Sequence, residues 1–153
     1  LMKIIVLNLQ KKIPVNAKRI KKSALKVLSL EGIKKPGEIS ISFVNDRKIK
    51  ELNLRYLGKN KPTDVLAFNI TDAHKEARRI RCNIFADIVI STDTAIRNAR
   101  IFKTTPVYEL YLYIVHGLLH LSGYDDKSKK DKLIMHKKEK SLLMLLSLFP
   151  DNR

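Results

Sequence analysis

The sequence is poor in cysteine and in acidic residues, and it contains no long run of apolar residues. Its one cysteine, Cys82, excludes a disulfide within the chain and is typical of proteins in a reducing compartment. No apolar stretch approaches the roughly 20 residues that a membrane-spanning helix needs. The apolar start of the chain is too short for the hydrophobic part of a signal peptide. We therefore expect a cytoplasmic protein with no membrane partner.

The shortage of acidic residues makes the chain strongly basic. It has 31 lysines and arginines against 15 aspartates and glutamates, which gives a formal net charge of +16. Such a charge favours a polyanionic partner, and nucleic acid is the commonest one for a basic domain of this size. Lysine also serves simply to keep proteins soluble, so the charge favours RNA or DNA without establishing either.

Hydrophobic periodicity predicts about four strands and five helices that alternate along one domain, residues 1–153. The expected strands are residues 1–9, 38–44, 65–70 and 83–90, the first of them buried. The expected helices run from about 16 to 32, 45 to 57, 91 to 102, 105 to 123 and 127 to 149. The fold class is α/β, a layered sandwich with a mixed sheet. The helix at 105–123 is apolar almost all round, so it should be the buried central helix.

Two histidines, His116 and His120, stand four residues apart on this central helix. That spacing puts both imidazoles on one helix face about one turn apart, as a shared metal ion requires. Gly123 lets the helix end and the chain turn back, because glycine accepts a left-handed conformation. Asp126, just beyond the turn, is then in place to supply a third ligand, with Asp125 as an alternative by proximity. Three protein ligands and one open position are typical of a catalytic zinc site.

An isolated pair of histidines at this spacing is more often an ordinary hydrogen-bonded pair on a half-buried face. The turn glycine followed by a carboxylate shifts the balance towards a metal site at the C-terminal end of the helix. Zinc peptidases place a glutamate directly after the first histidine. This sequence has Gly117 there, which disfavours a metallohydrolase acting on peptides.

The segment from His116 to Asp126, HGLLHLSGYDD, closely resembles the signature of the YbeY family of bacterial rRNA-maturation endoribonucleases, His-Gly-x-Leu-His-Leu-x-Gly-Tyr-Asp-His. Residues 52–68 and the segment ADIVIS at residues 86–91 are similar to that family as well. The resemblance implies a zinc-dependent, single-strand-specific endoribonuclease in 16S rRNA 3′-end maturation and ribosome quality control. It also implies a small α/β sandwich, with single-stranded rRNA and the small ribosomal subunit as partners and no dinucleotide cofactor.

Two residues depart from the family pattern. Asp126 stands where the family has a third histidine, so an anionic oxygen replaces a neutral nitrogen, and a divalent ion other than zinc becomes an alternative. Leu57 stands where many members carry an arginine that assists cleavage, and leucine cannot stabilise charge on a phosphate. Three basic residues lie within a few positions of Leu57 and are the candidates for that role: Arg55, Lys59 and Lys61.

The mechanistic hypothesis follows from these residues. One Zn²⁺ per chain, held by His116, His120 and Asp126, polarises a phosphoryl oxygen and lowers the pKa of bound water. Basic side chains near Leu57 neutralise charge that develops on the phosphate. The candidate catalytic residues are Arg55, Lys59, Lys61 and His116. The alternative is a non-catalytic ribosome-binding or RNA-binding factor with a structural or vestigial metal site, which both departures favour.

Other polar residues of interest lie outside the HGLLHLSGYDD segment. Asp64 is expected to buttress a loop, whereas Asp87 is either a member of a buried network or a partner of a metal-bound histidine. Residues 127–140 carry seven lysines against two acidic residues, which fits either a solvated helix face or contact with an RNA backbone. His74 and His136 belong to no motif and are expected on the surface.

Overall fold

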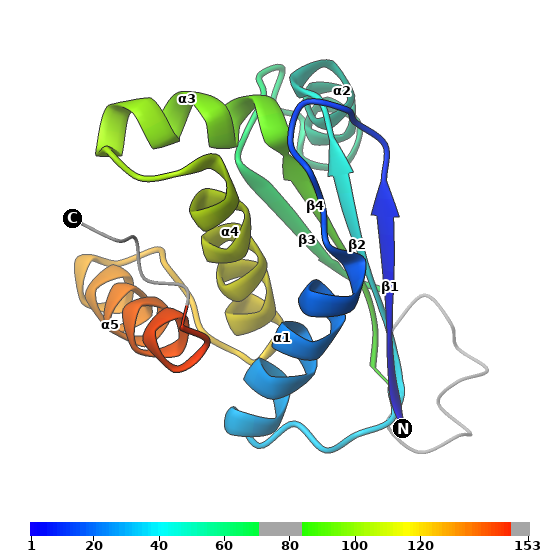
Figure 1. The fold of residues 1–153 in the computed structure, drawn as a ribbon, viewed down its shortest axis with the longest axis vertical. Helices are drawn as coiled ribbons and strands as arrows, with labels where there is room; N and C mark the ends of the chain where they lie inside the picture. The colour runs from blue at the N-terminus through cyan, green and yellow to red at the C-terminus, as the bar shows by residue number, and fades with distance from the viewer. Residues whose placement is uncertain (71–83, 148–153) are drawn as a thin grey trace.

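A four-stranded sheet covered by helices organises the protein, as the computed structural model shows for residues 1–70 and 84–147 (Figure 1). The strands lie in the order β1-β2-β4-β3, where β1 pairs parallel with β2, β2 pairs parallel with β4, and β3 is antiparallel to β4. The sheet is therefore mixed, as predicted. The strand bounds are β1 Met2–Asn8, β2 Gly37–Val44, β3 Val65–Asn69 and β4 Ile84–Ser91.

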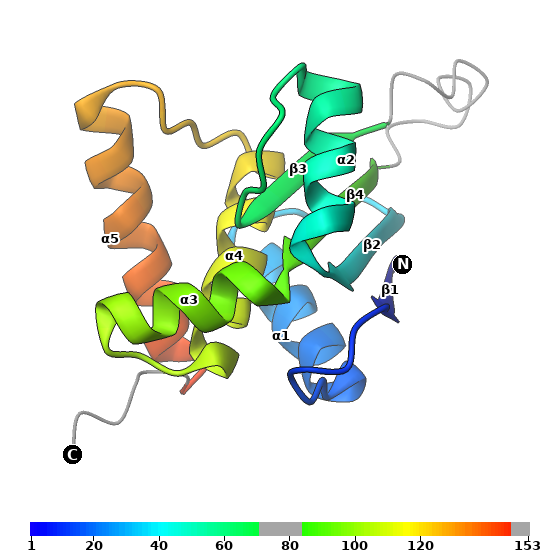
Figure 2. The ribbon, with the colours of Figure 1, turned by 90° about the horizontal axis from the view of Figure 1, so that it is seen from above.

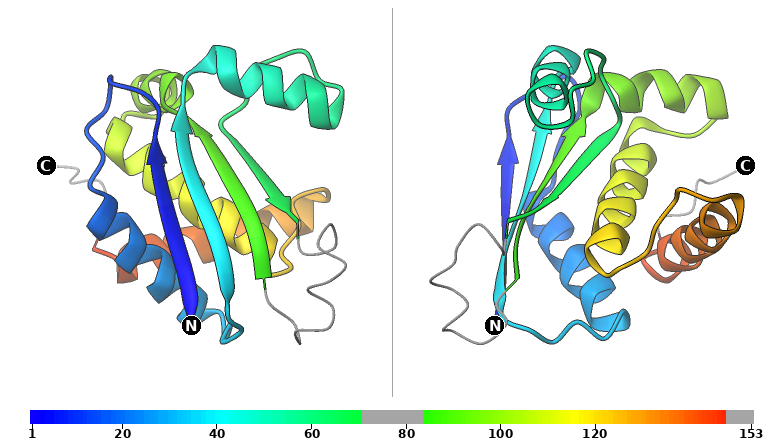
Figure 3. Two further views of the ribbon diagram at one scale, coloured as in Figure 1. Left: turned by 90° about the vertical axis from the view of Figure 1, so that its right-hand side faces the viewer. Right: turned by 180° about the vertical axis from the view of Figure 1, so that it is seen from behind.

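The helices form layers on both sides of the sheet. In the described part of the chain they are α1 Ala17–Leu30, α2 Asp46–Leu57, α3 Thr92–Phe102, α4 Pro106–Leu121 and α5 Lys129–Leu145. Helices α1 and α4 lie against one face, and α5 lies outside α4 as a third layer (Figures 1 and 3). Seen from above in Figure 2, α2 and α3 lie near the same end of the sheet. None of these helices is long and apolar enough to cross a membrane.

Side-chain caps start the helices at the predicted positions. Asn45 accepts a hydrogen bond from the backbone N–H of Lys48 at the start of α2, and Ser91 accepts one from Thr94 at the start of α3. Each cap satisfies a backbone donor that has no partner within its own helix. The end of each preceding strand is therefore also the start of the next helix, which keeps these connections short.

The core divides according to the alternation of side chains along the strands. Ile88 and Ile90 of β4 belong to the main cluster beneath α1 and α4, where nearly every residue of α4 is buried or half-buried. Val89, which points the other way, joins a smaller cluster with Ile49 of α2 and Leu66 of β3. The prediction that residues 105–123 form the buried central helix is confirmed.

The first strand differs from its prediction. Of the residues of β1, Ile4 is buried and the others are half-buried or exposed. The reason is topological, because β1 is one of the two edge strands of the described sheet and pairs with β2 alone. Its apolar composition therefore predicted a strand correctly and a fully buried one wrongly. The predicted charged connection at residues 71–81, with His74, lies outside the described residues, as does Cys82.

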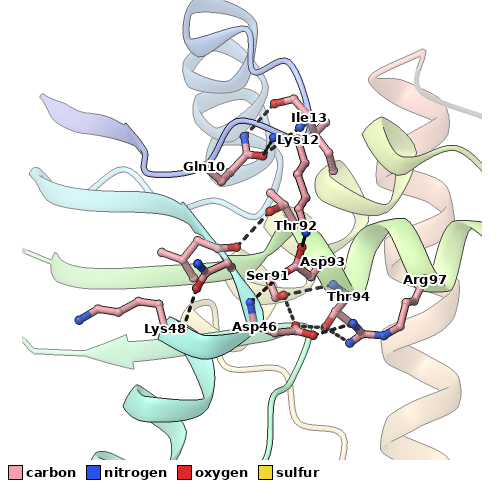
Figure 4. Close-up of polar contacts among 12 residues, drawn as sticks. Gln10, Lys12, Ile13, Asp46, Lys48, Ser91, Thr92, Asp93, Thr94 and Arg97 are labelled. Carbon is pink, nitrogen blue, oxygen red and sulfur yellow. Dashed lines mark hydrogen bonds and ion pairs between the residues drawn. The ribbon is translucent and has the colours of Figure 1, made fainter.

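A polar network joins the starts of α2 and α3 (Figure 4). The Asp46 carboxylate accepts hydrogen bonds from Ser91 Oγ at 2.6 Å, Thr94 Oγ1 at 2.9 Å and Arg97 Nη1 at 2.6 Å. Burial by itself would raise the pKa of Asp46, but these three hydrogen bonds and the Arg97 charge outweigh it and hold the pKa below its usual range. The network thereby fixes α2, whose last residue is Leu57.

A second carboxylate extends this network to the β1–α1 connection. Asp93 accepts a hydrogen bond from the backbone N–H of Asp46 at 2.9 Å and forms an ion pair of 2.7 Å with Lys12. The bond from the Asp46 backbone and the bond from Lys12 lower the pKa of Asp93. Three connections at this end of the sheet are thus held together by two ionised aspartates.

Candidate metal centre

The two predicted histidine ligands and Asp126 converge beside the last turn of α4. The Nε2 atoms of His116 and His120 lie 3.0 Å apart, and Asp126 Oδ2 lies 3.5 Å from each of them. A tetrahedral ion with bonds of about 2.0–2.1 Å requires ligand atoms about 3.3 Å apart. The triangle of these three atoms has the dimensions of one face of such a tetrahedron. The side chains are half-buried, so a fourth position is open to a ligand from solvent.

The hydrogen bonds of the two imidazoles determine which nitrogen faces the centre. His120 Nδ1 lies 3.1 Å from the carbonyl oxygen of Tyr124, and His116 Nδ1 lies 2.9 Å from Glu139 Oε1. Because a carbonyl and an ionised carboxylate only accept, each Nδ1 carries the proton and donates it. The two Nε2 atoms then face each other at 3.0 Å, a contact that is stabilised when a proton or a metal cation lies between them. The residues present therefore fit a metal ion.

The turn that returns the chain to this point forms as the sequence predicts. Gly123, with φ of +102°, follows the end of α4, and its N–H donates to the carbonyl of His120 at 3.1 Å. The next N–H, that of Tyr124, donates to Leu119 at 3.0 Å, which completes a Schellman motif. A left-handed residue is required here, and glycine adopts that conformation without steric cost.

The loop beyond the turn is fixed by polar contacts. Asp125 Oδ1 accepts a hydrogen bond from the backbone N–H of Asp126 at 2.7 Å, and Asp126 rather than Asp125 reaches the two histidines. The Tyr124 hydroxyl donates to Glu31 Oε2 at 3.1 Å, just after α1. Lys138 of α5 pairs with the same glutamate at 3.0 Å, so this lysine of the 127–140 run has an internal partner.

The centre is negatively charged although the chain as a whole is basic. Burial alone would lower the pKa of His116, but the hydrogen bond that His116 donates to Glu139 and the charges of Glu139, Asp64 and Asp126 raise it above its ordinary value. Carboxylates that favour an imidazolium also favour a metal cation at the same place. The local electrostatics therefore suit a divalent ion.

A pocket of about 360 Å³ opens beside the centre. It is lined by His116, Gly117, His120 and Asp126, by residues 63–68 and by Leu57. Asp64 Oδ1 accepts hydrogen bonds from the N–H of Val65 at 2.7 Å and from Thr63 Oγ1 at 3.2 Å, which is the predicted buttressing role. The volume is within the usual range for a small-molecule site.

The predicted basic residues lie near this pocket but do not form its wall. Leu57 lines the pocket and is 53% exposed. Arg55 is in the last turn of α2, Lys59 and Lys61 follow the helix, and all three are exposed and absent from the pocket lining. Their part in catalysis stays a prediction.

Gly117 has a packing role that bears on the peptidase alternative. A Cβ built on Gly117 would lie 3.0 Å from Ile88 Cγ2 and 3.2 Å from Ile88 Cδ1. Ile88 is fully buried in the sheet, so it has little room to move. A glutamate at this position, as in a zinc peptidase, would therefore require Ile88 or the helix to shift by a few tenths of an ångström.

Sequence reasoning missed Glu139 and left open a wrong alternative for Asp87. Asp87 accepts a hydrogen bond from Ser40 at 2.5 Å and has the opposite strand parity to Ile88, so it faces away from α4 and is no partner of a ligand histidine. That partner is Glu139, which shares the buried side of α5 with Met135 and Leu142. A glutamate at apolar helical spacing was the available signal. His136 is exposed, as expected.

The fold and the site define a single-domain α/β protein with a candidate divalent-metal centre at the end of its central helix. The family model described as Endoribonuclease YbeY matches residues 5–147. The chain belongs to this family.

Individual relatives agree with this assignment. The endoribonuclease YbeY of Syntrophus aciditrophicus is 38% identical over 151 residues, covering 97% of this chain and 92% of the relative. That of Pelotomaculum thermopropionicum is 36% identical over 150 residues, covering 96% and 99%. The solution structure of a Thermotoga maritima protein, 27% identical, superposes with a TM-score of 0.62 and covers 94% of this chain and 88% of that one.

Proposed function

We propose that this protein is a metal-dependent endoribonuclease that cleaves single-stranded RNA, with one Zn²⁺ held by His116, His120 and Asp126. The observation that carries the proposal is the convergence of two Nε2 lone pairs and one carboxylate oxygen at 3.0–3.5 Å beside an open pocket. Membership in the YbeY family supports RNA as the substrate.

The chain's own residues bind and orient the RNA. A divalent ion at the centre supplies Lewis-acid polarisation of the phosphodiester and lowers the pKa of water. In this proposal the scissile phosphate lies in the pocket, whose lining includes the apolar side chains of Leu57, Leu66 and Phe68. Arg55, Lys59 and Lys61 are exposed and lie within four positions of Leu57, and in this proposal they neutralise charge on the phosphate.

The physiological role that we propose is maturation of the 16S rRNA 3′ end and ribosome quality control in the cytoplasm, with the small ribosomal subunit as partner. The motif resemblance and the net charge of +16 support this role. Such a charge gives long-range attraction to rRNA that is independent of sequence. The metal centre then distinguishes the cleavage site from the general basic surface.

The test compares cleavage of a single-stranded RNA with cleavage of the same strand in a duplex, for wild type and His120→Ala. We expect wild type to cleave the single strand, to lose activity after chelation and to recover it with Zn²⁺. The variant should be inactive in all arms, because two remaining ligands do not retain the ion. Circular dichroism checks that the variant is folded. Chelator-resistant cleavage at the wild-type rate would contradict the proposal.

A second candidate is a non-catalytic RNA-binding factor. One observation favours it. The apolar side chain of Leu57 lines the pocket, whereas the three basic residues close to it in the sequence do not. Single-turnover conditions with protein in excess distinguish the two functions. Saturable binding of the single strand with no metal-dependent product would favour the second candidate.

A further inference from the structure

Glu139 is a buried carboxylate on a lysine-rich helix. It is 5% exposed and lies on the face of α5 that carries the buried residues Met135, Leu142 and Leu143. An ionised carboxylate loses hydration when it is buried, and this is tolerated only with a hydrogen-bonded or charged partner. A glutamate among apolar residues on this face therefore requires a specific partner.

That partner is His116. Glu139 Oε1 lies 2.9 Å from His116 Nδ1, whereas Oε2 lies 3.7 Å from the 76% exposed His136, beyond hydrogen-bond distance. Within the described residues, the ion pairs of Glu139 are with these two histidines, and no lysine of α5 neutralises it. The contact with His116 is therefore the main compensation for its burial.

We propose that Glu139 is a positioning residue for the metal centre, which holds His116 with its Nε2 lone pair directed at the ion and supplies the charge that balances it. The inference rests on the metal centre of the proposed function and assigns to α5 a role in it. By accepting the Nδ1 proton, Glu139 fixes both the tautomer and the ring orientation of His116.

Charge balance gives an independent reason for this assignment. Two neutral histidines and the Asp126 carboxylate would leave a dication with one uncompensated positive charge. Glu139, 2.9 Å from one of those ligands, supplies a compensating negative charge, and Asp64 in the pocket lining adds another. A centre whose positive charge is compensated costs less to bury than one whose charge is not.

The contact also links two layers of the fold. Helix α5 is the outermost layer beside α4 (Figure 1). Glu139 provides its polar contact with the centre. The apolar residues of the same face pack α5 against the rest of the protein. This packing holds Glu139 in place, and Glu139 in turn orients the ring of the ligand His116. Metal affinity should consequently depend on a residue that does not itself coordinate.

The test measures Co²⁺ affinity by competition with a chelator for wild type, Glu139→Gln and Glu139→Ala. Glutamine retains an acceptor oxygen but loses the charge, and alanine loses both. We expect affinity to fall about 10-fold to 100-fold, more for alanine than for glutamine, because loss of such an outer partner has effects of this size. The Co²⁺ absorption spectrum should also change, since ligand geometry determines it.

Asp131→Asn is the matched control, because Asp131 is an acidic residue in the first turn of the same helix and belongs to no contact of the centre. It should bind Co²⁺ with wild-type affinity. Nitrogen-15 NMR of the metal-free proteins gives a second readout, in which His116 should be the Nδ1–H tautomer in wild type and lose that preference in Glu139→Ala. If Glu139→Ala does not fold, the Co²⁺ affinity and absorption spectrum of the isosteric Glu139→Gln variant provide the test.

Wild-type Co²⁺ affinity and an unchanged spectrum in Glu139→Gln, or an unchanged His116 tautomer in a folded Glu139→Ala, would overturn the inference. The result is separable from the RNA assay. A wild type that binds Co²⁺ in a Glu139-dependent way without cleaving RNA supports this inference and contradicts the proposed activity. A wild type that binds no metal overturns both.

Discussion

The Nε2 atoms of His116 and His120 lie 3.0 Å apart, and each ring is held in place by an acceptor at its Nδ1 atom. Both Nδ1 acceptors come from other parts of the chain, so contacts outside the pair orient the two rings. Two oriented lone pairs and the Asp126 carboxylate form a preorganised cation site. Preorganisation lowers the entropic cost of binding, because the ligands need not be ordered by the ion.

Leu57→Arg should increase RNA cleavage. Leu57 lines the pocket that contains the ligands, and a guanidinium there can bind a phosphate with two hydrogen bonds. We expect kcat/KM for single-stranded RNA to rise about 10-fold or more, because single transition-state donors are worth about 10²–10³-fold where measured. Leu54→Arg is the control, since Leu54 is similarly exposed on α2 but absent from the pocket lining. Equal gains in both variants would show that added charge acts only through general attraction.

Asp126→His should retain a metal ion and alter which ion is preferred. A carboxylate suits harder ions such as Mn²⁺ and Mg²⁺, whereas a third imidazole favours Zn²⁺. We expect the ratio of Zn²⁺ to Mn²⁺ affinity to rise in this variant. Asp125→Asn, which keeps the oxygen that accepts from the Asp126 N–H, should leave the ratio unchanged. Competition titrations of both variants measure it, and a shift in Asp125→Asn alone would assign the ligand to Asp125.

Lys59→Gln and Lys61→Gln should weaken binding of single-stranded RNA and make it less sensitive to salt. A lysine that contacts a phosphate releases a counterion, and each lost contact lowers the slope of log affinity against log salt by about 0.7 for a single strand. Fluorescence anisotropy over a range of salt concentrations measures the slope. Slopes equal to wild type in both variants would remove these residues from the RNA path.

The Asp46 network should make stability depend on pH in the acid range. The pKa of Asp46 and that of Asp93 are held below their usual values in the folded state. Their contribution is therefore fully present above the unfolded-state pKa of about 3.9 and is lost as the pH falls through the folded-state values. Urea unfolding should show a declining free energy of unfolding below about pH 4.

Asp46→Asn tests that contribution. It should lower the free energy of unfolding by about 1–2 kcal/mol at pH 7, towards the lower end of values for charged hydrogen bonds because Arg97 is half exposed. In the same variant, the free energy of unfolding should fall less steeply as the pH is lowered below about 4. Glu51→Gln removes an exposed ion pair with Lys48 on the same helix and should change stability very little. An equally steep fall of the free energy of unfolding at acid pH in wild type and Asp46→Asn would contradict the assignment.

Local patterns predicted most of the fold. The caps at Asn45 and Ser91 and the glycine turn after α4 depend on a few neighbouring residues, so the sequence contains the information directly. The edge position of β1 does not follow from its own composition, because strand order depends on how distant segments pair. The composition of an apolar strand therefore predicts burial even where one edge of the strand is open to solvent.

The candidate site was predictable where its residues are close in sequence. His116, His120 and Asp126 lie within one helix end and one turn, and helical geometry brings them together. Glu139 lies at the site only because α5 packs on α4. The lysines around it in the sequence are typical of a solvated helix face, so the sequence alone did not single it out. Asp87 could not be assigned to a face without the register of β4, which places it with Ser40.

The most direct test of the central claim is elemental analysis of the purified protein, with single-stranded RNA cleavage measured on the same samples, for wild type and Asp126→Ala. Our account predicts close to one zinc per wild-type chain, cleavage that rises in proportion to bound metal, and loss of both in the variant. Metal-free wild type that cleaves RNA at its full rate would contradict it. So would wild type that, after reconstitution with zinc, binds RNA without cleaving it.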